Sequence, residues 1–162
     1  SMGTLFAIQS AIDCPEKVAG LFLQAVPLRP YVHPKMTIAS AKLLFDVGVE
    51  EDPLARALEK DSGVEVDLRL WEYVLWPVRF VELLAECERI RHALSQLKVP
   101  TVALQSCKDE LVSDLSIRDL EKNEYVRVVK MENAGHFGYE GEEQRRMLDL
   151  FRGMVGDLTE VV

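Results

Sequence analysis

The chain has 162 residues, 48% of them hydrophobic, so it is long enough and apolar enough to bury one hydrophobic core. Its 27 acidic residues outnumber its 19 basic ones and give a formal net charge of −8. This balance argues against a general nucleic-acid-binding protein, because attraction to phosphates needs a basic surface. No apolar run approaches the ~18 residues that a membrane helix needs, so we expect no transmembrane segment.

The three cysteines, Cys14, Cys87 and Cys107, are scattered and odd in number. Disulfide frameworks use paired cysteines in oxidising compartments, so this usage favours a reducing cytoplasm. Residues 1–5 also lack the basic start of a signal peptide. Neither the cysteines nor the three histidines have the spacing of metal ligands, and no phosphate-loop or dinucleotide fingerprint is present. We therefore expect neither a metal nor a cofactor.

The first part of the chain predicts a helix followed by a strand. Residues 4–13 have apolar side chains at the spacing of one buried helix face: Leu5, Ile8, Ala11 and Ile12. Pro15 ends this helix, because the residue before a proline is biased out of the helical region. Residues 18–26 form a nearly continuous apolar run, which is typical of a parallel strand covered on both faces.

Residues 31–97 have a different pattern and are interpreted as a helical insert. Asp52 followed by Pro53 predicts a helix start, since the aspartate can cap the helix and proline is tolerated in its first turn. Residues 67–97 carry aromatic and aliphatic side chains at helical spacing. Pro77 is expected to kink or divide that segment.

The second part of the chain predicts two more strands. Residues 99–105 and 125–131 are typical of buried strands, and 113–122 of a short helix between them that Ser113 or Asp114 could cap.

A terminal helix begins near Glu142. Alternating strands and helices predict an α/β fold, a short parallel sheet with flanking helices and a helical cap insert. We expect the strands in the spatial order 18–26, 99–105, 125–131, with the insert at their C-terminal ends.

Asp109 and His136 are the candidate functional pair. Asp109 directly follows the strand at 99–105, and His136 follows the strand at 125–131 after a permissive glycine, Gly135. Alone, each residue could be an ordinary surface residue of a loop. Together they are more informative, because the loops at the carboxyl ends of adjacent parallel strands are neighbours. A carboxylate there can orient a histidine, so we expect a hydrogen bond from Asp109 to the imidazole Nδ1.

Ser1, Met2 and Gly3 precede the first helix. Small residues around a serine at a strand-to-helix turn are the second half of a G-x-S-x-G nucleophile elbow. An alternative is that Ser1 was left by tag removal and Met2 is a start codon. Cys107 is a weaker nucleophile candidate, since it lies on the loop of Asp109 and buried, inert cysteines are common. An N-terminal serine that uses its own amine is conceivable, but the strand–helix pattern does not support it.

These motifs resemble the α/β-hydrolase superfamily of the serine esterase and lipase type. Residues 1–21 are similar to its nucleophile elbow, helix and next strand, residues 99–112 to its acid loop, and residues 134–137 to its histidine loop. The chain order Ser, Asp, His is also that of the superfamily. The resemblance implies a C-terminal part of this fold that begins at the nucleophile elbow. Residues 1–30 and 98–162 would form the partial core, and 31–97 the cap or lid.

The resemblance also implies roles for individual residues. Ser1 matches the nucleophile, Asp109 the triad acid and His136 the base, while the backbone N–H of Met2 matches one oxyanion donor. Ser106 stands where the superfamily often has glycine. The strands before the elbow and the loop that gives a second oxyanion donor have no counterpart in the 162 residues.

The implied activity is hydrolysis of a small or lipid-like carboxylic ester through an acyl-enzyme, without a cofactor. Four aromatic residues are candidates for the substrate pocket, although ordinary core or interface positions are the alternative: Trp71, Trp76, Phe80 and Phe137. The alternative function is a truncated, catalytically inactive hydrolase fragment that acts as an interaction or orphan domain. An apolar strand at 18–26 without a neighbour on its outer side would also favour a homodimer.

Overall fold

The computed structural model describes residues 1–31, 34–62, 74–136 and 139–159. Its centre is a sheet of three parallel strands in the order β1-β2-β3, which confirms the predicted topology. The strands are β1 (Leu21–Gln24), β2 (Thr101–Ser106) and β3 (Val126–Met131). Leu21 lies opposite Thr101, which in turn lies opposite Val126. Their carboxyl ends therefore share one edge of the sheet.

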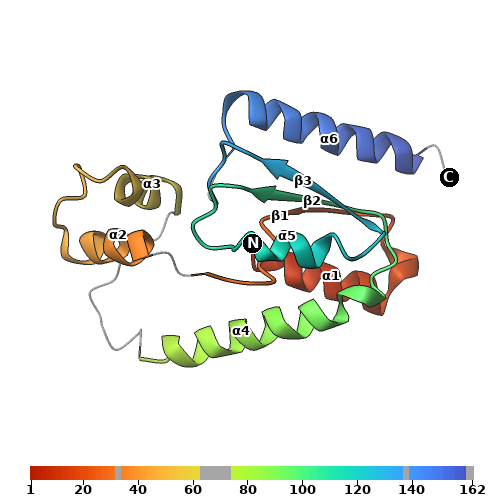
Figure 1. Cartoon of the computed structure of the whole chain (residues 1–162), viewed down its shortest axis with the longest axis horizontal. Coiled ribbons are helices and arrows are strands. Elements are labelled where there is room, and N and C mark those ends of the chain that lie inside the picture. Colours follow the sequence, from red (N-terminus) through yellow and green to blue (C-terminus); the bar gives the residue numbers. More distant parts are fainter. Residues whose placement is uncertain (32–33, 63–73, 137–138, 160–162) are drawn as a thin grey trace.

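Helices cover both faces of this sheet (Figure 1). On one face, α1 (Gly3–Asp13), α4 (Trp76–Ala93) and α5 (Leu115–Leu120) form the larger hydrophobic cluster. On the other face, α6 (Gly141–Thr159) packs on the sheet, and Phe151 meets Phe22 of β1 edge-on at 5.3 Å between ring centroids. The α/β class predicted from the sequence is confirmed by this layering.

The insert region divides into two parts in the structure. Cys87 and Ile90 on the last turns of α4 are buried with Leu5 and Ile8 of α1, so this half of α4 belongs to the main hydrophobic cluster. By contrast, α2 (Pro34–Phe45) and α3 (Pro53–Ser62) pack on each other around Ala39, Val49 and Ala55. Figure 1 shows them beyond the carboxyl ends of β2 and β3. The boundary of a cap at 31–97 stays a prediction.

The first strand is shorter than the predicted range 18–26. Val18 still belongs to the preceding 3-10 turn, because its N–H donates to Pro15 O at 3.2 Å. At the other end, Ala25 has a left-handed φ of 52°, which ends the extended conformation. The edge of β1 that pairs with no described strand is therefore short, and Leu23 and Val26 are buried in the core.

The start of α5 corrects one predicted cap. Ser113 Oγ accepts the Leu115 N–H at 3.2 Å, whereas Asp114 has helical dihedrals and its side chain makes no capping bond. The helix is also shorter than the predicted range 113–122. Ser113 is thus the capping residue, since its hydroxyl satisfies a donor that the first turn leaves open.

Prolines lie in the first turns of the helices in the insert region, and two of them, Pro53 and Pro77, bear on the sequence predictions. Asp52 Oδ1 accepts the N–H groups of Leu54 and Ala55 at 3.0 and 3.3 Å, which confirms the predicted cap of α3. Pro77 lies in the first turn of α4, so it marks the start of a helix, as division of the segment at this proline would require, and does not kink a helix. The first turn needs no N–H from proline, and the helix therefore runs on without a break. Residues 67–73, part of the segment that Pro77 was expected to divide, lie outside the described residues.

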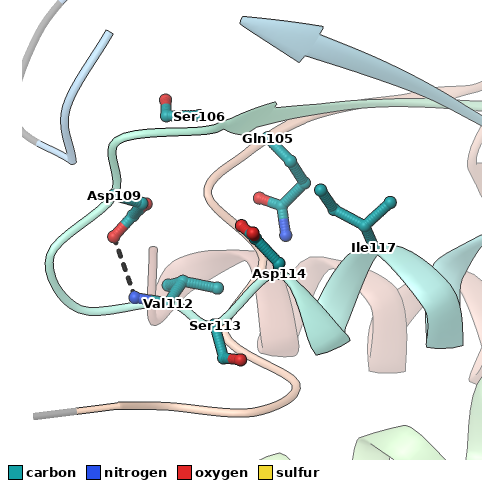
Figure 2. Close-up of a pocket in the computed structure, with 7 residues that line it drawn as sticks. All are labelled: Gln105, Ser106, Asp109, Val112, Ser113, Asp114 and Ile117. Atoms are coloured by element: carbon teal, nitrogen blue, oxygen red, sulfur yellow. Dashed lines mark hydrogen bonds between the residues drawn. The ribbon is translucent and has the colours of Figure 1, made fainter. Parts of the chain in front are cut away.

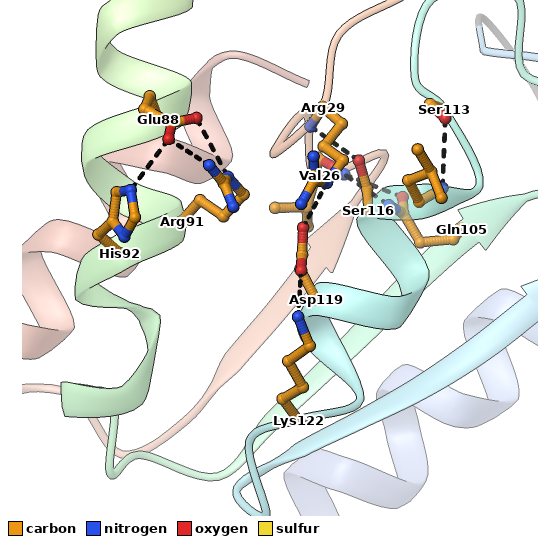
Figure 3. Close-up of polar contacts among 11 residues, drawn as sticks. Val26, Arg29, Glu88, Arg91, His92, Gln105, Ser113, Ser116, Asp119 and Lys122 are labelled. Carbon is orange, nitrogen blue, oxygen red and sulfur yellow. Dashed lines mark hydrogen bonds and ion pairs between the residues drawn. The ribbon is translucent and has the colours of Figure 1, made fainter.

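Three residues of the segment that leaves β1, Val26, Arg29 and Pro30, are held against β2, α5 and the loop between them. Gln105 pairs with the backbone of Val26, accepting its N–H at 3.0 Å and donating to its carbonyl at 3.1 Å. Farther on, the Arg29 N–H donates to Ser116 Oγ at 2.9 Å, and its guanidinium pairs with Asp119 at 2.6 Å (Figure 3). Pro30 then forms an antiparallel bridge with Val112.

The buried carboxylate of Asp119 is expected to make stability depend on pH. Burial raises its pKa, but hydrogen bonds from Arg29 and Lys122 outweigh burial and hold the pKa below its usual value. A lowered pKa in the folded state stabilises the protein above about pH 4, and this contribution is lost as the pH falls. The loss of unfolding free energy between neutral pH and about pH 3 should therefore be smaller in Asp119→Asn than in wild type. Asp149→Asn, at an exposed position, is the control in chemical denaturation, and equal losses in all three proteins would contradict the assignment.

Candidate active site

The acid loop after β2 is folded around the carboxylate of Asp109. Its Oδ1 accepts the N–H groups of Leu111 and Val112, both at 2.8 Å, so the loop turns back on its own side chain. Figure 2 shows the carboxylate facing the Val112 N–H. The crevice that Asp109 lines with Gln105 and Ser106 is too tight to admit a water molecule. The carboxylate is therefore fixed by backbone donors and shielded from solvent on this side.

The imidazole of His136 lies against this carboxylate, as the sequence predicted. Its Nδ1 is 3.0 Å from both Oδ1 and Oδ2 of Asp109. The side chains are 7% and 2% exposed for His136 and Asp109, respectively. A carboxylate on Nδ1 fixes the ring orientation and favours the tautomer with the proton on Nδ1. This leaves Nε2 in the form that can accept a proton from a nucleophile.

Ser1 lies at the same edge of the sheet. Its terminal nitrogen donates to the carbonyl of Gln24, the last residue of β1, at 2.9 Å. Burial lowers the pKa of this amino group, and the charge of Asp109 partly opposes that shift. The structure therefore brings Ser1 toward the Asp109–His136 pair. Among the hydrogen bonds of the described residues none joins the Ser1 hydroxyl to His136, and the pairing of these two residues stays a prediction.

Met2 occupies the N-cap position of α1. Backbone N–H groups at the start of a helix have no acceptor within that helix, so they are suited to bind an oxyanion. The proposed role of Met2 as an oxyanion donor is compatible with this position and stays a prediction.

Sequence reasoning missed a polar contact beneath the pair. Ser106 Oγ donates to the phenol of Tyr139 at 3.2 Å, and both residues are buried. Burial raises the pKa of Tyr139, the Ser106 hydrogen bond opposes this, and the negative charge of Asp109 adds to the rise. Tyr139 thus stays a neutral phenol that ties the end of β2 to the segment before α6. The only signal in the sequence was the serine at 106 in place of glycine.

The aromatic candidates are distributed unevenly. Trp76 and Phe80 lie on the first turns of α4 and are 61% and 45% exposed. Trp71 and Phe137 lie outside the described residues. The use of these four side chains in a substrate pocket stays a prediction.

The described ranges contain no group of three or more His, Cys, Asp or Glu side chains placed to hold a metal ion. Of the helices that the structure describes, none is both long and apolar enough to cross a membrane.

Solved structures with an α/β-hydrolase fold are similar to this chain. One of two metagenome-derived lipolytic enzymes matches with a TM-score of 0.60 at 18% identity over 96% of this chain and 62% of that structure. The monoacylglycerol lipase of Paleococcus ferrophilus matches with a TM-score of 0.55 at 18% identity, over 96% and 66%. An α/β-hydrolase enzyme from a Medee basin deep-sea metagenome library matches with a TM-score of 0.55 at 17% identity, over 96% and 62%.

These identities establish the fold and not the activity. The chain spans 62–66% of the length of the three structures, so it has part of the α/β-hydrolase fold, as the sequence motifs predicted. No protein-family model matches the sequence, and a comparison with curated proteins gives no match either.

Proposed function

We propose that this chain carries the catalytic residues of a serine hydrolase that cleaves a small or lipid-like carboxylic ester. The observation that carries the proposal is the contact of His136 Nδ1 with the Asp109 carboxylate at 3.0 Å, at the carboxyl edge of a parallel sheet. In open α/β sheets, ligands bind and catalytic groups lie beyond the carboxyl ends of the strands.

The proposed mechanism assigns one role to each residue. Ser1 Oγ attacks the ester carbonyl while His136 Nε2 takes its proton, and Asp109 stabilises the resulting imidazolium. The N–H of Met2 donates to the oxyanion. His136 then protonates the leaving alcohol, and water releases the acyl group from Ser1 by the same route in reverse. Exposed aromatic side chains on α4, Trp76 and Phe80, would contact the acyl chain.

The experiment that tests this proposal compares the chain with a version extended by the residues encoded upstream of Met2. We expect the 162-residue chain alone to hydrolyse a nitrophenyl ester poorly, because it supplies only one of the two oxyanion donors; losing one donor costs about 2.7–4 kcal/mol of transition-state stabilisation. The extended protein should be active and lose turnover on Ser1→Ala, while Ser95→Ala, at an exposed serine, should not affect it. Robust turnover by the short chain that depends on Ser1 would contradict this prediction.

The second candidate is a fragment that keeps the fold without catalysis and acts as an interaction or orphan domain. It is favoured by β1, which pairs only with β2 among the described strands and so offers an edge to a partner. An upstream reading frame without a strand and a G-x-S sequence would support this alternative. The free thiols of Cys14, Cys87 and Cys107 fit the proposed cytoplasmic location under either candidate.

We further propose that the isolated chain is a homodimer. The outer edge of β1 has no strand beside it in the described residues, and α6 leaves a row of apolar side chains 42–47% exposed: Leu148, Phe151 and Val155. Two copies that meet at this edge would each bury the same patch against the other copy. The interface is expected to exceed about 2,000 Å². Sedimentation at low micromolar concentration should show a dimer that Phe151→Glu weakens. A folded monomer in wild type would contradict the prediction.

A further inference from the structure

Glu110 is the second of two consecutive carboxylates in the acid loop, and it makes contacts of a different kind from those of Asp109. Asp109 serves its own loop and the imidazole ring. Glu110 instead reaches the next loop, where its Oε2 accepts the backbone N–H of His136 at 3.1 Å. One loop therefore holds His136 twice, by the ring and by the backbone.

The glycine before His136 fits against this carboxylate. A Cβ atom added to Gly135 would lie 3.1 Å from Glu110 Oε1 and 3.3 Å from Oε2, which is tighter than ordinary contacts. Glu110 therefore lies flat against the Gly135–His136 backbone because residue 135 has no side chain. The close approach explains the glycine without any unusual backbone dihedral.

We propose that Glu110 is a positioning residue that fixes the backbone of His136 so that its Nδ1 stays on Asp109. The inference rests on the proposed serine-hydrolase function, but it concerns geometry that can be measured without turnover. The His136 imidazole keeps its Nδ1 on Asp109 only if both the position and the orientation of the ring are fixed. The Asp109 bond sets the orientation, whereas the bond from the His136 N–H to Glu110 sets the place. Hydrogen bonds to charged acceptors are among the stronger ones in proteins, so the anchor is effective.

The test is the Nδ1 proton of His136, observed by NMR in the 162-residue chain labelled at histidine. With three histidines in the sequence, His136→Gln assigns the signal. Glu110→Ala should speed exchange of this proton with solvent about ten- to a hundredfold. Glu110→Gln keeps an acceptor oxygen and should restore slow exchange. Glu132→Ala removes an exposed carboxylate from the His136 loop and should leave the signal unchanged.

A second variant keeps the test decisive if Glu110→Ala does not fold. Gly135→Ala should push the carboxylate away and speed the exchange in the same way, yet add nothing in a protein that already has Glu110→Ala, because the two changes act on one contact. An Nδ1 proton that exchanges at the wild-type rate in folded Glu110→Ala, or in Gly135→Ala if the former does not fold, would overturn the proposal.

The outcome is separable from that of the proposed function. Slow exchange that depends on Glu110 in a protein without esterase activity would support the positioning role and count against the hydrolase. The opposite outcome is that the extended protein is an active esterase, and that Glu110→Ala folds and changes neither this activity nor the exchange rate of the Nδ1 proton. It would support the hydrolase and count against the positioning role.

Discussion

Replacing Asp109 with asparagine is expected to lower kcat for ester hydrolysis about 10⁴-fold in the active, extended protein and to leave the free energy of unfolding within about 1 kcal/mol of wild type. Both expectations follow from the two sides of this carboxylate. Its Oδ1 accepts the N–H groups of Leu111 and Val112, and an amide oxygen can do the same. The Nδ2 of asparagine would then face the imidazole of His136.

Replacement of Asp109 Oδ2 by an amide nitrogen reverses the favoured tautomer of the His136 imidazole. Asp109 Oδ2 is an acceptor 3.0 Å from His136 Nδ1, whereas an amide NH₂ is a donor at the same place. Oδ1 also lies 3.0 Å from Nδ1, but it already accepts two backbone N–H groups, so the amide NH₂ favours the tautomer in which Nδ1 accepts and the proton is on Nε2. In that tautomer His136 could no longer take a proton from Ser1. The change therefore removes the chemistry and preserves the loop.

The matched variant is Asp109→Ala, which removes both functions. It leaves the N–H groups of Leu111 and Val112 without their acceptor, and each unsatisfied buried donor costs about 1–3 kcal/mol. Steady-state kinetics and urea denaturation of both variants separate the two roles. If Asp109→Asn kept more than about a tenth of wild-type kcat, Asp109 would not be the triad acid.

Replacing Gln105 with leucine is expected to lower the free energy of unfolding by about 2–5 kcal/mol. The Gln105 side chain is 2% exposed and pairs with both the N–H and the carbonyl of Val26, which is itself fully buried. Leucine fills similar space but leaves the Val26 N–H without a partner and its carbonyl with the Leu28 N–H alone. Few single changes outside the apolar core should cost as much.

Two variants bracket this effect in urea denaturation. Gln105→Glu keeps an acceptor for the Val26 N–H but, when ionised, buries a charge and turns an oxygen toward the Val26 carbonyl, so a loss at neutral pH at least as large as that of leucine is expected. Gln96→Leu places the same substitution at an exposed position and should change the free energy by less than about 0.5 kcal/mol. A loss below 1 kcal/mol for Gln105→Leu would mean that water replaces the side chain.

The sequence predicted those parts of the fold that depend on local pattern. Strands β2 and β3 and the first helix followed from apolar runs and periodicity, and Asp109 and His136 followed from topology, because loops after adjacent parallel strands must be neighbours. The C-terminal end of β1 could not be predicted. The left-handed Ala25 precedes Val26, whose backbone is held by Gln105 from a strand far away in the sequence.

The remaining contacts depend on how far side chains reach across loops. Nothing in the local pattern distinguishes Glu110 from the other acidic residues of the chain, yet it accepts the His136 N–H. The Ser106–Tyr139 contact likewise joins two segments whose separation only the folded chain defines. The choice between a kink and a helix start at Pro77 could not be made from the sequence either, because it depends on where the helix begins.

The register of the sheet implies an order of folding. β2, α5 and β3 are consecutive, so Thr101 meets Val126 by closing a short loop. Leu21 meets Thr101 only after the whole of residues 31–97 has been bridged, and longer loops lose more chain entropy on closure. The β2–α5–β3 unit should therefore form first and serve as the template onto which α1 and β1 dock. The Asp109–His136 pair lies entirely within the early unit and its following loop, while Ser1 arrives with the late one.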